Sequence, residues 1–478
     1  MRIVHAASEL YPYVKTGGLA DVVGALATAL AGRGHEVSVL IPGYRAVLES
    51  PLVKGAKRSH RLSVRLGQRE LAGDVHTLDV QPGLSLHLVV RDEFFDRRQL
   101  YWNGERNYDD NAERFIFFQK AVVEFMRLEG GGYDVLHAHD WQTGLLPLLL
   151  RNAEQRRGVK LAVRTVFTIH NMMYQGVFPR SSFALTNLHE SLNAMDVIEY
   201  FGQISLLKGG IMYADRVTTV SPTYAREIQT AEHGCGLEGV VKLRSTAVRG
   251  IRNGIETSVW NPATDKYLPA NFTVENLAGK AACRAALLDR LGWTEPCTGP
   301  VFAIVSRMTT AKGHDLLRGA MAYLAKKNCR LVVLGSGEAQ YEEAHLASAA
   351  AHPGRVAVHI GVDEDLSHLV FAGADFFLMP SHTEPCGLTQ MYAQAYGTVP
   401  LASRVGRLLD TVRDIAEYGE EGTGIMFRPE PNDFVNALGR ALKLHANPAR
   451  YATVQRCAMQ QDFSWENVVG PYEQLYRE

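Results

Sequence analysis

The chain has 478 residues, of which 46% are hydrophobic and 21% charged, and its 50 basic and 51 acidic side chains give a formal net charge of −1. This length exceeds the number of residues that a single hydrophobic core usually organises, so two domains are expected. The balanced charge excludes an electrostatic basis for binding nucleic acid or an anionic membrane. The sequence contains neither a long uncharged apolar run that could span a membrane nor the basic start and apolar block of a signal peptide.

The first predicted elements are a strand over residues 2–8, which form a short apolar run, and a helix over residues 21–33, whose apolar side chains recur at helical spacing. Gly34 ends that helix, and residues 35–41 form the next strand. A strand, a loop, a helix and a strand in this order indicate a βαβ unit with a parallel sheet.

The loop inside this unit contains Lys15, Gly17 and Gly18. The glycines lack a Cβ, so a ligand can approach the backbone, while the next helix presents free N–H groups and the lysine adds a positive charge. These features suit an anionic ligand, above all a phosphate. The alternative, which the loop alone favours equally, is a tight strand-to-helix turn with a surface lysine.

The N-terminal half continues with alternating strand and helix patterns. Residues 133–140 predict a strand that ends in polar side chains, followed by a helix from about Trp141, and residues 163–170 predict another strand. Residues 217–220 form a short strand, after which Ser221 can cap a new helix.

An aromatic and charged stretch over residues 94–117 interrupts this alternation and contains Tyr101, Trp102, Tyr108 and Asn111. Rings that stack on the apolar face of a sugar, next to polar groups that bond its hydroxyls, are typical of a sugar site. The alternative, equally favoured, is a structured insertion whose rings fill a small core of their own.

The pattern breaks near residue 250, and the second half then repeats the plan of the first. A strand at residues 301–305 leads into a polar loop that contains Arg307 and Lys312, and a helix follows at residues 315–326. Further strands are predicted at residues 331–334, 356–360, 374–379 and 399–402, and a last helix at residues 463–476.

We therefore predict an α/β fold with two doubly wound, Rossmann-like domains that face each other across a deep cleft. The N-terminal domain is expected to span residues 1–248 and the C-terminal domain residues 249–460. The helix over residues 461–478 is expected to pack back on the N-terminal domain after the second domain has closed.

Six polar side chains fall at the carboxyl ends of predicted strands, where open α/β sheets bind ligands. They are Lys15, Asp140, His170, Arg307, Lys312 and Glu384. Two cations in one loop suit a diphosphate leaving group, because fixed cations stabilise the charge that develops on it. Taken singly, each residue is better explained by a structural role, such as a helix cap at Asp140 or a backbone-bonded buried ring at His170. Together they favour a site in the cleft.

The six cysteines, at positions 235, 283, 297, 329, 386 and 457, form no Cys-x-x-Cys pair. This spacing indicates neither a zinc site nor a disulfide framework. We therefore expect a cytoplasmic protein that needs no metal and no cofactor, and the sequence leaves its oligomeric state open.

Eight short motifs are spread over nearly the whole chain. They are residues 15–21 (KTGGLAD), 137–141 (HAHDW), 168–171 (TIHN), 174–176 (YQG), 221–225 (SPTYA), 253–255 (NGI), 260–262 (WNP) and 384–390 (EPCGLTQ). In order and composition they resemble the glycogen and starch synthases of bacteria and plants that use ADP-glucose, which are glycosyltransferases of the GT-B fold. The first and the last motif are the most specific.

The resemblance implies retaining transfer of glucose from a nucleotide sugar to the non-reducing end of an α-1,4-glucan, which elongates glycogen. It implies catalytic roles for five residues. Arg307 and Lys312 hold the departing diphosphate, Glu384 binds the glucose hydroxyls, His170 lies against the sugar, and Asp140 orients glucose or acceptor. The transition state is oxocarbenium-like, so the carbon gains positive charge while the phosphate gains negative charge.

The resemblance also divides the binding residues between the two domains. The donor is implied to contact Lys15, Gly17, Gly18, Gly387, Leu388, Thr389, Val362, Gly406 and Arg407. The N-terminal domain is implied to bind the acceptor glucan, and the aromatic stretch supplies its candidates Tyr101, Trp102, Tyr108 and Asn111.

Three positions depart from the family pattern, all in the donor half. His382 stands where the family has arginine, Arg407 replaces the second glycine of a Thr-Gly-Gly-Leu motif, and Val362 stands where an aromatic ring can cover the base. If glycine is needed there for a positive φ, Arg407 is strained, so we expect a shifted loop with a solvent-facing side chain or a direct phosphate contact. The changes bear on nucleotide preference and turnover.

Three functions are open at this point. The first is an ADP-glucose-dependent glucan synthase, the second the same reaction with UDP-glucose or another nucleotide sugar, and the third a weakly active glucan-binding relative. The presence of Lys15, His170, Arg307, Lys312 and Glu384 favours an enzyme. The expected partners are a nucleotide sugar and an α-1,4-glucan such as glycogen, with neither nucleic acid nor membrane.

Overall fold

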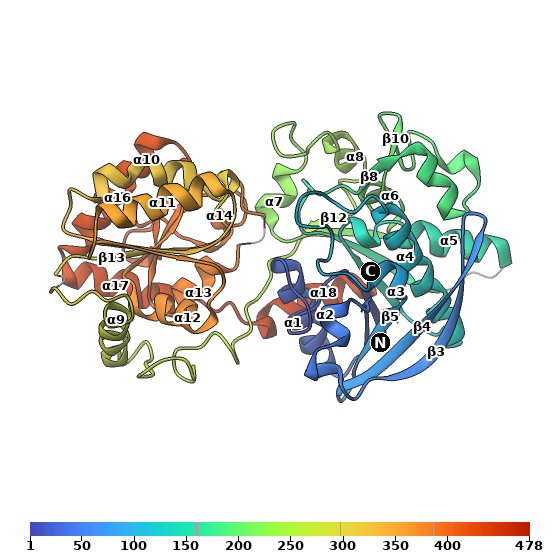
Figure 1. The fold of residues 1–478 in the computed structure, drawn as a ribbon, viewed down its shortest axis with the longest axis horizontal. Coiled ribbons are helices and arrows are strands. Elements are labelled where there is room, and N and C mark those ends of the chain that lie inside the picture. The colour runs from blue at the N-terminus through green and yellow to red at the C-terminus, as the bar shows by residue number, and fades with distance from the viewer. Residues whose placement is uncertain (158–161, 297, 386) are drawn as a thin grey trace. The chain divides into compact units, whose positions relative to one another are not determined.

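The computed structural model describes residues 1–157, 162–296, 298–385 and 387–478, and it divides into two compact units (Figure 1). The first unit contains Met1–Gly254 and Trp465–Glu478, and the second contains Ile255–Ser464. Each unit has its own parallel sheet with its own helices. In the described parts of the chain, no helix is long and apolar enough to cross a membrane.

The central sheet of the first unit has the strand order β12-β11-β7-β6-β1-β2-β5-β4-β3. The strands from β12 to β5 pair in parallel, and β4 and β3 extend the sheet as antiparallel strands. The bounds are Arg2–Ala6 (β1), Glu36–Pro42 (β2), Lys57–Leu66 (β3), Arg69–Gln81 (β4), Leu84–Val90 (β5), Val135–His139 (β6), Arg164–Ile169 (β7), Arg216–Thr219 (β11) and Val248–Gly250 (β12). A small antiparallel sheet joins β8 (Val177–Pro179), β10 (Gln203–Ser205) and β9 (Glu199–Tyr200).

The helices of the first unit include the last helix of the chain, α18, which packs against α1 (Figure 1). The bounds are Gly18–Gly32 (α1), Arg45–Leu48 (α2), Asp92–Phe95 (α3), Asn111–Leu128 (α4), Leu146–Arg157 (α5), Leu206–Tyr213 (α6), Pro222–Glu227 (α7), Glu238–Leu243 (α8) and Trp465–Arg477 (α18). Glu473 of α18 accepts hydrogen bonds from Arg33 and His35, which follow α1 directly. The two ends of the chain therefore stabilise the same unit.

The second unit has an all-parallel sheet in the order β15-β14-β13-β16-β17-β18. The strands are Val301–Val305 (β13), Arg330–Gly335 (β14), Val356–Ile360 (β15), Phe376–Met379 (β16), Val399–Ser403 (β17) and Ile425–Phe427 (β18). The helices are Ala278–Arg290 (α9), His314–Leu324 (α10), Ala339–Ala351 (α11), Glu364–Gly373 (α12), Thr389–Ala395 (α13), Leu408–Thr411 (α14), Ile415–Tyr418 (α15), Pro431–His445 (α16) and Pro448–Met459 (α17).

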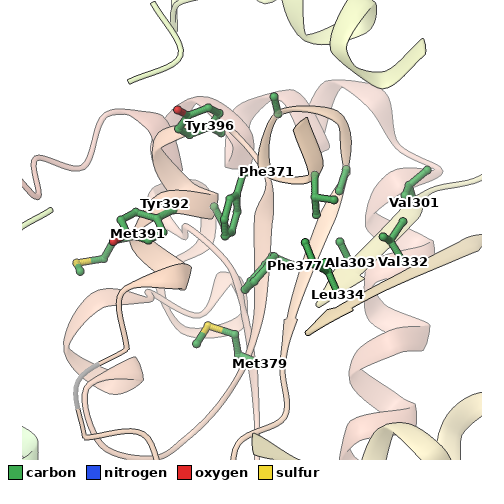
Figure 2. Close-up of a cluster of buried hydrophobic side chains, with 14 of the residues drawn as sticks. Val301, Ala303, Val332, Leu334, Phe371, Phe377, Met379, Met391, Tyr392 and Tyr396 are labelled. Atoms are coloured by element: carbon green, nitrogen blue, oxygen red, sulfur yellow. The ribbon is translucent and has the colours of Figure 1, made fainter. Parts of the chain in front are cut away.

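Both faces of this second sheet are buried, which explains why its strands are continuous apolar runs. Along β13, Val301 and Ala303 point to one core, while Phe302 and Ile304 point to the other. Figure 2 shows the first core, in which Phe371 and other side chains of α12 and α13 meet those of the strands. The doubly wound arrangement predicted from the sequence is confirmed.

The structure also differs from the sequence prediction at the starts of several helices. Helix α1 begins at Gly18 rather than at residue 21, since the extended Gly17 (φ −161°) precedes it directly. The helix expected from Trp141 starts as a 3₁₀ turn, and α5 begins only at Leu146. The long helix α4 begins at Asn111, inside the aromatic stretch over residues 94–117, in which no helix was predicted.

Candidate active site

The glycine loop between β1 and α1 is held by Glu9, which is buried. Its carboxylate accepts hydrogen bonds from the backbone N–H of Thr16 at 2.5 Å and from Thr16 Oγ1 at 2.6 Å. Lys15 Nζ lies 2.8 Å from the carboxylate of Asp21, in the first turn of α1. A Cβ added to Gly17 would meet nothing within 4 Å, so the backbone is open to a ligand there.

Glu9 also connects this loop to the aromatic stretch. The hydroxyl of Tyr101 donates to Glu9 Oε1 at 2.6 Å and lies 2.8 Å from Ser8 Oγ. Sequence analysis did not select Glu9, although the signal was present, because Glu9 is a polar residue that closely follows the carboxyl end of a buried strand. The other candidates were chosen by the same rule.

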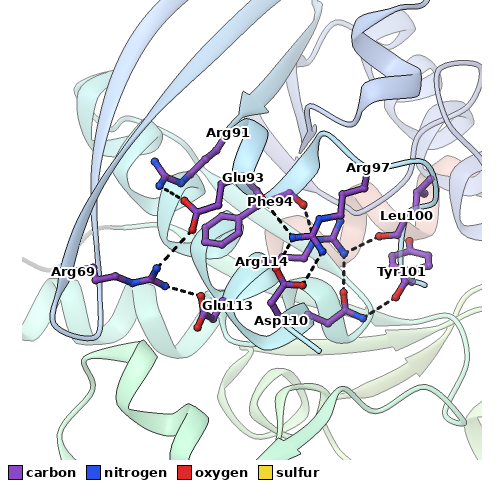
Figure 3. Close-up of polar contacts among 11 residues, drawn as sticks. Arg69, Arg91, Glu93, Phe94, Arg97, Leu100, Tyr101, Asp110, Glu113 and Arg114 are labelled. Carbon is purple, nitrogen blue, oxygen red and sulfur yellow. Dashed lines mark hydrogen bonds and ion pairs between the residues drawn. The ribbon is translucent and has the colours of Figure 1, made fainter. Parts of the chain in front are cut away.

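The rest of the aromatic stretch forms a polar network around Arg114, which is fully buried (Figure 3). Arg114 donates to the carbonyl oxygens of Phe94 and Leu100 and to Asn111 Oδ1, at 2.6 to 2.9 Å. Asn111 in turn donates to the carbonyl oxygen of Tyr101 at 2.9 Å. Asn111 therefore has a structural role, because it joins Arg114 to the backbone of Tyr101.

The two other rings of the stretch differ in their surroundings. Tyr108 packs its ring against the guanidinium groups of Arg97 and Arg114, at 4.7 and 5.0 Å from the ring centroid. Trp102 has 45% of its surface exposed. The packing of Tyr108 agrees with the alternative interpretation of a structured insertion, whereas the ring of Trp102 is exposed.

Asp140 and His170 meet at the carboxyl ends of β6 and β7. Asp140 Oδ1 accepts a hydrogen bond from the backbone N–H of His170 at 2.7 Å, and its side chain caps no helix. Burial raises the pKa of Asp140 to about 7, although the hydrogen bonds from the backbone of His170 and Asn171 oppose this shift. Asp140 also has a left-handed backbone (φ 56°), a conformation that is uncommon outside glycine.

Four buried histidines surround this point: His5, His137, His139 and His170. His139 is hydrogen-bonded to His5 at 3.0 Å and to His170 at 3.1 Å, while His137 lies 2.7 Å from the hydroxyl of Tyr476 and 2.6 Å from that of Thr168. Burial lowers the pKa of all four rings, to about 3 for His5 and His170, so they are neutral near pH 7.

The same cluster holds the one group of potential metal ligands found among the described residues. Nitrogen atoms of His5, His137 and His139 lie within 4.8 Å of one another. Both ring nitrogens of His137 and both of His139 already form hydrogen bonds, so an ion bound by these rings has to break at least two of them.

In the second unit, Lys312 and Glu384 form an ion pair. Lys312 Nζ lies 2.7 and 2.6 Å from the two carboxylate oxygens of Glu384, which is only 4% exposed. Ser381 Oγ and the backbone N–H of Gly387 donate to the same carboxylate at 3.1 and 3.2 Å. The expected neighbours Lys312, Glu384 and Gly387 are therefore brought together.

The loop that carries Lys312 requires glycine at its end. Gly313 has φ 76°, and a Cβ there would lie 1.9 Å from the carbonyl oxygen of Pro380. This close approach places the end of the loop against the segment that leads to Glu384. Arg307, in contrast, is exposed just beyond the end of β13.

The remaining donor candidates of the second unit differ in exposure. Leu388 and Thr389 are half-buried at the start of α13, and Val362 is 91% exposed after β15. Cys386, within the motif at residues 384–390, lies outside the described residues.

Arg407 does not point to solvent, so that expectation is wrong. Its side chain is fully buried, with Nη2 3.3 Å from the sulfur of Met391. The positive φ falls on Gly406 (48°), whereas Arg407 has an ordinary φ of −66° and bears no steric penalty. Its backbone N–H donates to the carbonyl oxygen of Glu384 at 3.0 Å, so the loop lies against the Glu384 segment.

His382, the second departure, joins the two loops of this site. Its ring lies 3.0 Å from the carboxylate of Asp315 in the first turn of α10, and its backbone N–H donates to the carbonyl oxygen of Ala311. Sequence analysis flagged the residue but did not find its partner, which is 67 positions away.

Comparison with family models gives two matches that together cover most of the chain. Residues 2–243 match the starch synthase catalytic domain, and residues 290–456 match the glycosyl transferases group 1. The first match covers the glycine loop, the aromatic stretch and the histidine cluster, and the second covers the Lys312–Glu384 pair.

Full-length relatives agree with these models. The chain is 54% identical over 478 residues to the glycogen synthase of Opitutus terrae, with all of both chains covered. It is 42% identical to glycogen synthase 1 of Methylococcus capsulatus, with all of this chain and 96% of the relative covered. Among solved structures, the catalytic domain of starch synthase IV from Arabidopsis thaliana, bound to ADP and acarbose, matches with a TM-score of 0.92 and 32% identity, covering 99% of this chain and 98% of that one.

Proposed function

The chain belongs to the glycogen and starch synthases, glycosyltransferases of the GT-B fold, and from this we propose that it transfers glucose from ADP-glucose to the non-reducing end of an α-1,4-glucan with retention of configuration. The observation that carries the proposal is the paired Lys312 and Glu384 at one edge of a parallel sheet, next to the N–H of Gly387. The choice of ADP-glucose as the donor is supported by the ADP that is bound in the structure of the relative from Arabidopsis thaliana.

In this proposal the second unit meets both charges of the transition state. Lys312, with Arg307, stabilises the negative charge that grows on the departing diphosphate. Glu384 holds the Lys312 ammonium in place and presents its carboxylate to the glucose, whose anomeric carbon becomes positive. Because the cations of the protein supply the positive charge that the departing diphosphate needs, we propose that the reaction needs no metal. Full activity after treatment with a chelator supports this proposal.

The first unit is proposed to bind the acceptor and to add contacts to the donor. Asp140 fixes the backbone of His170, which is proposed to lie against the glucose. Gly17 and Gly18 let the donor approach the backbone, and Lys15 adds positive charge. Trp102 is the exposed ring proposed to stack on the glucan.

A second candidate donor is UDP-glucose, and the observation that favours it is Val362. An exposed valine cannot stack on adenine as an aromatic ring does, and such stacking is worth roughly 1–3 kcal/mol. We therefore propose ADP-glucose as the donor, with a weaker preference over UDP-glucose than an aromatic residue at this position would give.

The test is to incubate the protein with a glycogen primer and a panel of nucleotide sugars and to measure the nucleotide released. Release that is fastest with ADP-glucose, and a lower Michaelis constant for it in Val362→Tyr, supports the proposal. Faster release with UDP-glucose favours the second candidate. If none of the nucleotide sugars in the panel releases nucleotide, while the protein binds the glucan, the protein is a glucan-binding relative instead.

A further inference from the structure

The polar loop that carries Arg307 and Lys312 in the second unit is joined to helix α11 near both of its ends. At the first end, Ser306 Oγ lies 3.0 Å from His314 Nε2, and His314 Nδ1 lies 2.8 Å from His345 Nε2 on α11. Both rings are fully buried. Whichever ring carries the proton between them, their bond joins the start of the loop to α11 through the first residue of α10.

At the other end of the loop, the hydroxyl oxygens of Thr310 and Tyr341 lie 2.6 Å apart. Thr310 begins the 3₁₀ turn that ends at Lys312, and Tyr341 lies in the first turn of α11. The backbone N–H of Thr310 also donates to Glu338 Oε1, directly before the same helix, at 3.3 Å. One link to α11 therefore directly precedes Arg307, and the other lies within the turn of Lys312.

The buried face of α11 consists of the two side chains that make these links. Tyr341 and His345 are four positions apart, so they lie on one face of the helix, and they are its buried residues. The next residue, the apolar Leu346, is 47% exposed, while His345 Nδ1 is buried without a partner among the described residues. A buried polar group costs free energy unless it is bonded, and two apolar side chains would cover the core without that cost. Packing alone therefore does not explain this face.

We propose that Tyr341 and His345 are positioning residues that hold both ends of this loop from α11, so that its two cations are already in place when the diphosphate departs. Cations that need not rearrange stabilise a developing negative charge more strongly than cations on a loose loop. The diphosphate in this inference rests on the proposed function, whereas the two links between the loop and α11 are properties of the free protein.

The first experiment needs no substrate and measures hydrogen exchange of the full chain by mass spectrometry. Tyr341→Phe and His345→Met each remove one link but keep the size of the side chain, so residues 306–313 should exchange faster than in the wild type, with β16 and β17 unchanged. His345→Gln, whose amide nitrogen can take the place of Nε2, should restore slow exchange. Unchanged exchange over residues 306–313 in both Tyr341→Phe and His345→Met overturns the proposal.

The second experiment measures the affinity for free ADP by calorimetry, and kcat with ADP-glucose, well below the melting temperature. In Tyr341→Phe we expect both to fall about threefold to tenfold, the effect of one ordinary hydrogen bond, while the Michaelis constant for a glycogen primer stays the same. A merely structural role lowers the amount of folded protein but not the affinity of each folded molecule. In a Thr310→Val background, in which the link is already broken, Tyr341→Phe should have no further effect.

Tyr323→Phe is the matched control, because it removes a tyrosine hydroxyl from the neighbouring α10, whereas the hydroxyl of Thr310 is bonded to Tyr341. It should change neither the exchange of the loop nor the affinity for ADP. If the wild-type protein binds no ADP, the proposed function is contradicted and this inference with it. If the wild-type protein and Tyr341→Phe bind ADP equally well, this inference alone is wrong and the proposed function stands.

Discussion

At the scale of single residues, Glu384 is held by several partners before any donor binds. Its carboxylate accepts from Lys312, Ser381 and the backbone of Gly387. A side chain that is preorganised in this way can stabilise a developing charge without rearranging, which is the larger part of many rate enhancements. It also means that truncating Glu384 leaves the partners behind, so alanine is a poor probe of its catalytic role.

Glu384→Gln is the sharper test, because glutamine has the same shape, its amide oxygen can still accept from Gly387, and its NH2 group can donate to the Ser381 hydroxyl. We expect turnover to fall at least about a hundredfold, the scale of a lost electrostatic contact. The melting temperature should change little. Glu343→Gln, on the exposed face of α11, is the matched control and should leave both quantities unchanged. Near-normal turnover in Glu384→Gln would remove this residue from the reaction.

Asp140 gives a prediction about pH. Its pKa is raised from 3.8 to about 7, so between these values the folded chain holds a proton that the unfolded chain has lost. The stabilising effect of this proton is fully present below pH 3.8 and is lost as pH rises through about 7. In Asp140→Asn the contribution of this proton to the pH dependence of stability should disappear. The measurement is the unfolding free energy of variant and wild type at pH 5 and at pH 8, and the difference between the two proteins should change between these two pH values. Between pH 5 and pH 8 this change is at most about 3 kcal/mol.

His382 stands where the family has an arginine, and its pair with Asp315 joins the loop of Lys312 to the segment of Glu384. Both side chains are about one-third exposed, so the pair contributes on the order of 0.2–1 kcal/mol. His382→Ala should therefore lower kcat/KM for the donor by up to about fivefold, and His382→Arg should restore it. An equal loss in both variants would show that the imidazole ring itself, and not only a donor to Asp315, is needed.

At the scale of the elements, Lys280 of α9 joins three parts of the second unit. Its buried ammonium donates to the carbonyl oxygens of Ala372, in the last turn of α12, and of Tyr396, just after α13, and to Thr398 Oγ1, at 2.8 to 2.9 Å. The C-terminal ends of helices carry partial negative charge, so a cation there is favourable. No apolar residue can satisfy these three acceptors.

Lys280→Met keeps the length of the side chain but removes the donor. Leaving the acceptors without a partner should lower the unfolding free energy by about 1–3 kcal/mol, measured by denaturant unfolding. Arg290→Met on the same helix is the control, because that side chain is mostly exposed and its ion pair is long, at 3.8 Å. A loss of the same size in both variants would show that the helix tolerates no uncharged residue, and not that Lys280 joins the helix ends.

The elements also show what the sequence could predict. Most parallel strands of both units were predicted, because strands buried on both faces are continuous apolar runs. The parallel strands β5, β12 and β18 were not predicted. The pair β3 and β4 was not predicted, because its strands alternate buried and charged, exposed positions and so contain none of the continuous apolar runs on which the strand predictions rested. The start of α4 was not predicted, because it lies within the aromatic stretch. There the side chains of Arg114 and Asn111 bond to carbonyl oxygens of residues 94–101 and do not cap the helix.

The site was predictable to the same extent. Asp140, His170, Lys312 and Glu384 all follow strands, so their positions could be read from the chain, and the structure brings them together in pairs within each unit. Their partners could not be read in this way. Glu9 reaches Tyr101 across 92 positions and His382 reaches Asp315 across 67, and no local pattern records such contacts. The burial of Arg407 is also a property of the packed loop, not of its sequence.

At the scale of the whole molecule, the last helix belongs to the unit formed by the start of the chain. Glu473 pairs with Arg33 and His35, and Tyr476 bonds His137 in the buried histidine cluster. Arg33 and His35 hold the pKa of Glu473 at about 2, below its usual value of 4.5. The stabilisation from this carboxylate is therefore present above pH 4.5 and is lost as pH falls through about 2.

A chain that ends at Ser464 should for this reason lose stability in the first unit and not in the second. Without α18, the buried face that includes Trp465, Tyr472 and Tyr476 is missing, and β1 and β6 lose cover next to the histidine cluster. Hydrogen exchange measured by mass spectrometry should show faster exchange in β1, β6 and α1, with β13, β14 and β16 unchanged. Glu473→Gln, which removes one ion pair but keeps the helix, should show a smaller effect in α1 alone. Faster exchange in the second unit of the shortened chain would mean that the helix stabilises both units, and that the two do not unfold as separate parts.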